Sequence, residues 1–125
     1  MEEAAVFFFN HHAGALPIYE KLEEAILARI PDVRIRVQKT QITFANRRVF
    51  ACASFLPARK SPDRPRDFLT VTFGLPCRRE APRIDVATEP YPNRWTHHVT
   101  VGSSDEIDEE LLGWLREAAA FSAAK

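Results

Sequence analysis

The sequence predicts an α+β fold: an antiparallel sheet of about five strands, with one helix in the N-terminal half and a C-terminal helix packed on one face. Three observations lead to this prediction. Amphipathic helical patterns lie near both ends of the chain, period-two alternation fills the middle, and the two patterns do not alternate as in βαβ units. The length of 125 residues fits a single domain, 1–125, and the 46% hydrophobic content is sufficient for a core.

The first helix is predicted at 15–30, after an N-terminal segment at 1–14. Pro17 fits the first helical position, where its missing N–H costs nothing. Apolar side chains then recur at helical spacing: Tyr19, Leu22, Ile26 and Ile30. Glutamates near the start and Arg29 near the end match the helix macrodipole, and Pro31-Asp32 ends the helix.

Antiparallel strands are predicted within 33–101. Apolar and polar residues alternate over 33–38 and again over 41–44, but on opposite parity, so a turn or bulge is expected between them. Asn46-Arg47-Arg48 has the composition of a hairpin turn into a strand at 49–56. Further strands are predicted at 68–75, 95–101 and, more briefly, 83–86. The proline-bearing segments are predicted to be loops: 57–67, 76–82 and 87–94.

The C-terminal helix is predicted at 104–122. Ser103 and Glu106 stand in the spacing of a capping box. Apolar residues follow at helical intervals: Ile107, Leu111, Trp114, Leu115 and Ala118. Acidic residues crowd the first two turns, where the macrodipole favours negative charge.

Charge is segregated along a chain whose net charge is zero. Between Arg29 and Arg94 there are 14 basic and 6 acidic residues, whereas the flanks hold 3 basic and 11 acidic residues. One interpretation is an anionic partner for the basic middle; the other is that acidic helices neutralise a basic sheet within the molecule. The sequence pI of about 6.9 is below that typical of a nucleic-acid-binding domain.

Polar side chains of alternate strand positions are predicted to share the solvent face of the sheet. Guanidinium groups and hydroxyls on such a face can bind phosphate or carboxylate. The predicted ligand-binding residues are Arg34, Arg36, Lys39, Thr70, Thr72 and His98, and Arg47 and Arg48 could extend this surface. The alternative is a solvated face in which threonine serves β-propensity alone.

The basic, proline-stiffened segment 59–66 is a second candidate contact surface. Arg59, Lys60 and Arg64 could grip a phosphate backbone, and such contacts would be sensitive to salt. The segment contains no aromatic side chain for base stacking, so an ordinary surface loop is the alternative.

Catalytic and metal signatures are weak. Cys77 and Arg83 have the Cys-x5-Arg spacing of thiolate phosphatases, but the intervening residues contain no glycine and Pro82 removes an N–H. The histidines form two adjacent pairs, and neighbouring strand residues point to opposite faces, so a metal site is not predicted. No catalytic residue and no cofactor is predicted, and the roles of His11, His12, His97 and Cys77 stay unassigned.

Short motifs along the chain resemble a bacterial domain-of-unknown-function family, number fifty-six fifty-five. The motifs are Tyr19-Glu20-Lys21-Leu22, Pro31-Asp32-Val33, Lys39-Thr40, Phe50-Ala51, His97-His98 and Asp108…Trp114-Leu115-Arg116-Glu117-Ala118. The resemblance covers about residues 16–122 and implies a small α+β domain, found alone or fused to other modules, some of them nuclease-like. It implies no catalytic residues.

The leading hypothesis is therefore a non-catalytic binding module for an anionic small molecule or protein partner. Alternatives are a nucleic-acid-associated accessory domain, a homodimeric interaction domain and, least favoured, a hydrolase. No apolar run approaches the length of a membrane span, and Glu2-Glu3 is the wrong sign for a secretory signal. A cytoplasmic location without membrane contact is expected.

Overall fold

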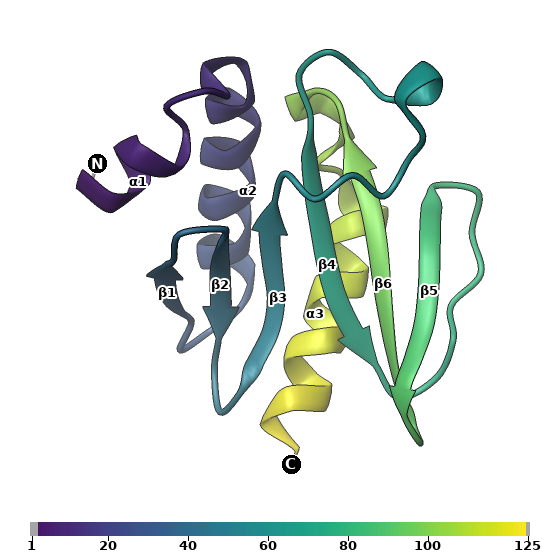
Figure 1. The fold of residues 1–125 in the computed structure, drawn as a ribbon. Helices are drawn as coiled ribbons and strands as arrows, with labels where there is room; N and C mark the ends of the chain where they lie inside the picture. The colour runs from purple at the N-terminus through teal and green to yellow at the C-terminus, as the bar shows by residue number, and fades with distance from the viewer. Residues whose placement is uncertain (1–2, 125) are drawn as a thin grey trace.

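The computed structural model describes residues 3–124 and confirms an α+β fold with an antiparallel sheet (Figure 1). The helices are α1 (Glu3–Phe8), α2 (Leu16–Arg29) and α3 (Glu109–Ala123). The strands are β1 (Arg34–Val37), β2 (Gln41–Ala45), β3 (Val49–Ser54), β4 (Leu69–Leu75), β5 (Ile84–Tyr91) and β6 (Arg94–Val101). Short 3-10 turns occur at Ala13–Ala15, Ser61–Asp63 and Ser104–Glu106.

The sheet has six strands in the order β1-β2-β3-β4-β6-β5, and every neighbouring pair is antiparallel. The sequence predicted about five strands and a loop over 87–94, which was wrong because β5 continues through Tyr91. β5 is an edge strand with two register irregularities. Pro90 is tolerated there because the outer side of an edge strand needs no ladder hydrogen bond.

The core lies between the sheet and helices α2 and α3, which run behind the sheet in Figure 1. Trp114 of α3 stacks on Phe73 of β4 with ring centroids 5.7 Å apart, and Phe73 in turn stacks on His97 of β6 at 5.1 Å. Leu22 and Ile26 of α2 are fully buried, as expected from their helical spacing.

The C-terminal helix begins later than the sequence predicts. Asp108 is the N-cap of α3, and its carboxylate accepts a hydrogen bond from the Leu111 N–H at 3.0 Å. The predicted capping role of Ser103 was wrong, because its side chain makes no capping hydrogen bond and it precedes only the 3-10 turn. Glu106 instead accepts a hydrogen bond from the Gly102 N–H at 3.2 Å.

The N-terminal segment contributes to the core rather than being a plain lead-in. Helix α1 was not predicted, and the segment that follows it places Phe9 against Tyr19 and against Phe55. His12 stacks on Phe55 with centroids 3.8 Å apart. Among the described residues no helix has the length and apolarity needed to cross a membrane.

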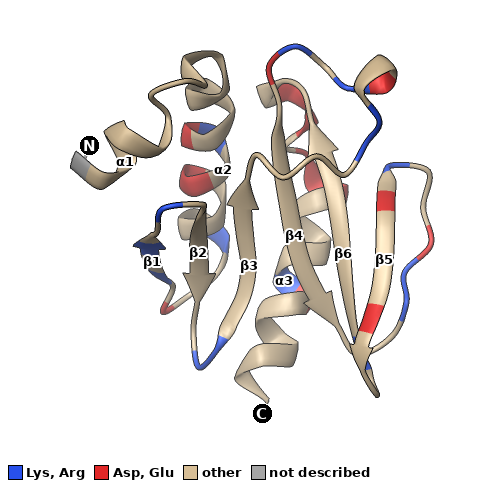
Figure 2. Cartoon of the chain, viewed as in Figure 1, with Lys and Arg blue, Asp and Glu red and all other residues tan. Residues whose placement is uncertain are grey.

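Part of the segregated charge is neutralised within the fold. Basic residues of the middle segment meet acidic residues of α3 and its N-cap: Arg29 pairs with Glu109, Arg79 with Glu117, and Arg83 with Asp108. Figure 2 shows that the other basic residues of the middle segment lie on β1, on turns and loops and, for Arg94, at the start of β6, whereas the centre of the sheet carries no charge. The site of an anion should therefore be sought at the periphery.

Candidate functional site

The predicted polar face of the sheet exists as a row of side chains across five strands. Arg36 of β1 is opposite Thr43, Thr43 opposite Cys52, Cys52 opposite Thr72, and Thr72 opposite His98. Because all five occupy the same register position, their side chains share one face of the sheet. Helices α2 and α3 lie on the other side, as Figure 1 shows.

This row does not bring its ends together around one small anion. Arg36 and His98 are separated by four strand spacings, or about 19 Å. The Thr72 hydroxyl and His98 Nδ1 are hydrogen-bonded to each other at 2.8 Å. Burial lowers the pKa of His98, so its imidazole is neutral near pH 7. The inner part of the row is a neutral hydrogen-bonding surface.

One predicted ligand-binding residue is inaccessible. Thr70 is 0% exposed, and its hydroxyl donates a 2.6 Å hydrogen bond to the Leu56 carbonyl. The chain that leaves β3 passes in front of the sheet at this point (Figure 1), which the strand pattern alone gave no reason to expect. Thr70 therefore holds this crossing segment in place rather than facing solvent.

The predicted loop residues are dispersed and partly occupied. Arg59 pairs with Asp85 of β5 at 3.2 Å, and the Arg64 guanidinium lies 5.5 Å from the ring centroid of Phe68. Lys60 is exposed. Lys39 lies far from this loop, in the turn between β1 and β2, where it lines a groove with Phe7 and Phe8. The structure does not bring these cations together.

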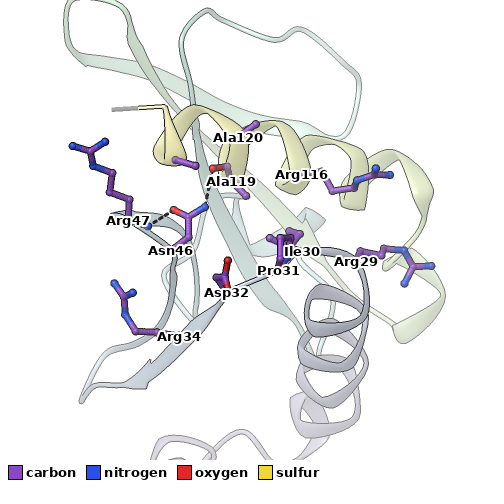
Figure 3. A pocket seen from close by; sticks show the side chains of 11 residues that line it. Arg29, Ile30, Pro31, Asp32, Arg34, Asn46, Arg47, Arg116, Ala119 and Ala120 are labelled. Atoms are coloured by element: carbon purple, nitrogen blue, oxygen red, sulfur yellow. Dashed lines mark hydrogen bonds between the residues drawn. The ribbon is translucent and has the colours of Figure 1, made fainter.

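A different group of basic residues surrounds a cleft of about 590 Å³ at one end of the sheet (Figure 3). It lies between the C-terminal ends of α2 and α3, the start of β1 and the turn that joins β2 to β3. The lining residues are Arg29, Ile30, Pro31, Asp32, Arg34, Asn46, Arg47, Arg116, Ala119, Ala120 and Ala123. We call it the arginine cleft.

The local sequence explains how the arginines reach this cleft. Arg29 is the last residue of α2, and Arg34 is the first residue of β1. Between them the chain reverses at Pro31-Asp32, where Asp32 has φ of 59°, in the left-handed region that aspartate tolerates better than most residues. This short reversal keeps two arginines five positions apart on the same cleft.

Asn46 and Ser122 hold the opposite wall in place. Asn46 Nδ2 donates to the Ala119 carbonyl near the end of α3 at 2.8 Å. The Ser122 hydroxyl donates to Asn46 Oδ1 at 2.6 Å and accepts from the Arg48 N–H at 3.1 Å. The turn that carries Arg47 is thereby fixed to α3, which carries Arg116.

Most of the positive charge in the arginine cleft is uncompensated. Arg29 pairs with Glu109 at 3.0 Å, but Arg34, Arg47 and Arg116 form no ion pair within residues 3–124. Asp32 is the one acidic residue of the lining, and the floor is apolar. An anion that enters this cleft would meet several guanidinium donors beside a surface with few competing acceptors.

Only part of the lining of this cleft was predicted from the sequence. Arg34 was predicted as a ligand-binding residue, and Arg47 as an extension of that surface. Arg29 and Arg116 were not predicted as site residues, because each lies in a helix whose other charged residues are typical of a solvent-exposed face. The remaining signal was Arg116 itself, a basic residue in an otherwise acidic helix.

Arg83, which has the Cys-x5-Arg spacing with Cys77, has a structural role. Arg83 is held by Asp108 at 2.7 Å and by the Glu106 carbonyl at 2.7 Å, so its guanidinium serves the start of α3 rather than Cys77. Burial raises the pKa of the Cys52 thiol. No group of three or more potential metal ligands is found among residues 3–124.

His97 is a core residue that orders a loop. It is 0% exposed, and its Nε2 accepts a 2.9 Å hydrogen bond from the Arg79 N–H. Burial lowers the pKa of His97, which keeps the ring neutral and able to accept this bond. His11 and His12 lie instead at the opposite end of the fold, where they line a groove with Phe55.

Comparison with known proteins gives a family and no relative of assigned activity. No curated protein and no solved structure matches the chain. A family model described as a domain of unknown function (DUF5655) matches residues 6–122, nearly the whole chain. The protein therefore belongs to the DUF5655 family, as the resemblance of its short motifs suggested.

Proposed function

We propose that this domain is a non-catalytic binding module that takes an anionic ligand, or an anionic group of a protein partner, in the arginine cleft. The observation that carries the proposal is the presence around one cleft of three guanidinium groups that form no ion pair with any residue in the described range 3–124: Arg34, Arg47 and Arg116. Concave sites with an apolar lining and a few convergent polar groups are typical of ligand binding.

The cleft differs from the flat sheet face because four arginines line one hollow. Guanidinium groups bind carboxylate or phosphate through paired N–H donors, and charge-assisted bonds of this kind are stronger than neutral ones. On the sheet, the row that begins at Arg36 places neutral partners next, at Thr43 and Cys52. In the cleft, arginines from separate chain segments line one space and lie toward its two ends (Figure 3).

The residues predicted on the sheet face lie outside the arginine cleft, with the exception of Arg34. Arg36 and Lys39 continue the positive surface from Arg34 along β1 and its turn (Figure 2). Thr72 and His98 would be reached only by a partner that extends across the sheet, because they lie on β4 and β6. A small anion held in the cleft does not require them.

Thermal unfolding in the presence of single anions tests the proposal. A ligand that binds the native state and not the unfolded chain raises the melting temperature, by an amount that grows with the ratio of its concentration to its Kd. We expect phosphate or carboxylate compounds to stabilise the wild type, and the triple variant Arg34→Ala, Arg47→Ala, Arg116→Ala to lose this effect. Arg66→Ala is the matched control, because Arg66 is exposed and lies outside the cleft. Equal shifts in all three proteins would contradict the proposal.

A nucleic-acid-associated domain remains a second hypothesis with weaker support. The row from Arg36 to His98 contains no Phe, Tyr or Trp on which a base could stack, and Arg59 is engaged by Asp85. Fluorescence anisotropy with a labelled oligonucleotide over a range of salt concentrations distinguishes it. Tight binding that falls steeply with salt and is insensitive to the cleft variants would favour this alternative.

Self-association is a third hypothesis. Both edges of the sheet end in strands with charged or proline residues, Arg34 and Arg36 on β1 and Pro90 on β5. Such residues discourage pairing of one edge with another. Light scattering at increasing protein concentration decides the matter, and a persistent monomer would remove the homodimer hypothesis.

A further inference from the structure

We infer that the ligand of the arginine cleft is a linear dianion, in which two acid groups are joined by an apolar spacer. This inference rests on the proposed function, because it assumes that the cleft binds an anion, and it adds the chemical class of that anion. It follows from where the charges stand within the cleft, from what lies between them and from the distance that separates them.

The arginines stand at the two ends of the cleft and not around its middle. Figure 3 shows Arg34 and Arg47 on one side and Arg29 and Arg116 on the other. The first pair is close along the backbone too, because Arg34 is opposite Ala45 in the β1–β2 ladder and Arg47 follows two residues later. The second pair is connected through α3, where Glu109 binds Arg29 and Arg116 lies two turns further on.

The distance between the two ends of the cleft can be estimated from positions along α3. Ser122 accepts a hydrogen bond from the Arg48 N–H at 3.1 Å, which fixes the turn that carries Arg47 to that point of the helix. Arg116 precedes Ser122 by six positions, or about 9 Å at the rise of an α-helix. One carboxylate or phosphate group cannot contact guanidinium groups anchored at both points without pulling the long side chains inward.

The middle of the cleft disfavours a negatively charged group of the ligand. Its lining there is apolar, with Ile30 and Pro31 on one side and alanines of α3 on the other. Asp32 lies between the two ends in Figure 3, and its carboxylate would repel a negative group placed at the centre. A neutral, apolar spacer fits this region, whereas a compact polyanion does not.

A monoanion would satisfy only one end. The guanidinium groups at the other end would remain without an acid partner, apart from the bond between Arg29 and Glu109. Because charge-assisted hydrogen bonds contribute more than neutral ones, the second acid group should add substantially to affinity. Two kinds of molecule contain two carboxylates separated by an apolar spacer: a free dicarboxylate, and a peptide segment with two glutamates that flank apolar residues.

Isothermal titration calorimetry with matched acids tests the inference on the full chain. Suberate and octanoate have the same carbon number and differ by one carboxylate, and succinate keeps two carboxylates on a short spacer. We expect suberate to bind at least about tenfold more tightly than octanoate or succinate. A capped peptide with two glutamates flanking apolar residues is titrated in parallel, and the tighter of the two dianions identifies the source of the acid groups.

Single-end variants give the sharper comparison. Arg116→Ala and Arg34→Ala should each reduce suberate affinity to about that of octanoate for the wild type, and should change octanoate affinity much less. Arg66→Ala should change neither. If octanoate binds as tightly as suberate and both need the cleft arginines, the dianion inference is wrong while the proposed function stands. If no anion binds, or binding ignores the cleft variants, the proposed function itself fails.

Discussion

Ser122, near the end of the last helix, donates a 2.6 Å hydrogen bond to the side chain of Asn46, which lies 76 residues earlier in the turn between β2 and β3. Asn46 Nδ2 in turn donates a 2.8 Å hydrogen bond to the Ala119 carbonyl. The serine is 3% exposed, and both bonds are partly buried. They define the relative position of two walls of the arginine cleft.

Replacement of Ser122 by alanine should therefore weaken both the fold and the cleft. The change removes the side-chain acceptor of the Arg48 N–H and leaves Asn46 Oδ1 with the Arg47 N–H alone, and the net loss of a hydrogen bond costs about 0.5–1.5 kcal/mol. We expect a loss of that size in the free energy of unfolding, measured by urea denaturation. Ser103→Ala is the control, because Ser103 is exposed and makes no capping bond. Equal stability of the two variants would contradict the role assigned to Ser122.

Asp108→Ala should destabilise the start of α3 by about 1–2 kcal/mol, the usual cost of removing an N-cap. The carboxylate accepts from the Leu111 N–H at 3.0 Å and from Arg83 at 2.7 Å. Burial alone would raise the pKa of Asp108, but these two donors outweigh it and lower the pKa. Its stabilising effect is therefore present above the unfolded-state pKa and is lost as the pH falls.

Asp105→Ala is the matched control for this change. Asp105 belongs to the same acidic segment, is exposed and forms no ion pair in the described part of the chain. Urea denaturation at neutral pH should separate the two variants clearly. The assignment of the cap would be wrong if Asp105→Ala proved the more harmful substitution.

Stability should fall between about pH 7 and pH 5 because of the two partly or fully buried histidines of β6. Burial lowers the pKa of His97 and of His98 in the native state, whereas in the unfolded chain both titrate near 6.5. Above that pH both states are neutral and the native state is not penalised. Below it the unfolded chain takes up protons that the native state resists, so unfolding becomes more favourable.

Denaturation at several pH values measures this effect. The double variant His97→Gln, His98→Gln should be less stable at neutral pH, since the Arg79 N–H loses its histidine acceptor. Its stability should nevertheless depend less steeply on pH over this range than that of the wild type. An unchanged slope in the double variant would show that other groups cause the dependence.

Glu109→Gln should strengthen anion binding in the cleft. Glu109 competes for Arg29 at 3.0 Å, and it is largely exposed, so the pair contributes little to stability. Removing its charge frees the guanidinium, and we expect up to about fivefold tighter binding of a dianion by calorimetry, the equivalent of about 1 kcal/mol. Glu110→Gln is the control because Glu110 lies 3.5 Å from Arg83, outside the cleft. Equal effects of the two changes would indicate only a general loss of negative charge.

Local patterns in the sequence were sufficient to predict the class of fold. The alternation around Val37 and Ile42 and the turn at Asn46 correspond to three strands of the sheet. The capping of α3 and the extent of β5 were predicted wrongly. Asp108 competes with Ser103 for the same role, and Pro90 is acceptable only because β5 is at an edge.

The cleft could not be predicted in full because it depends on the packing of distant segments. Arg34 and Arg36 alternate in a way that indicates a strand face, but the pattern does not show that Arg34 adjoins the end of α3. That proximity is produced by Asn46 and Ser122. Likewise, the burial of Thr70 depends on the crossing segment at Leu56, and no periodicity in β4 signals it.

Calorimetric titration of suberate into three proteins tests directly whether the arginine cleft is an anion site: wild type, the Arg34→Ala, Arg47→Ala, Arg116→Ala variant, and Arg66→Ala. We expect saturable heat for the wild type and for Arg66→Ala, and none for the triple variant, with circular dichroism used to show that all three are folded. Saturable binding of the same affinity by the folded triple variant would contradict the assignment of the cleft as the anion site.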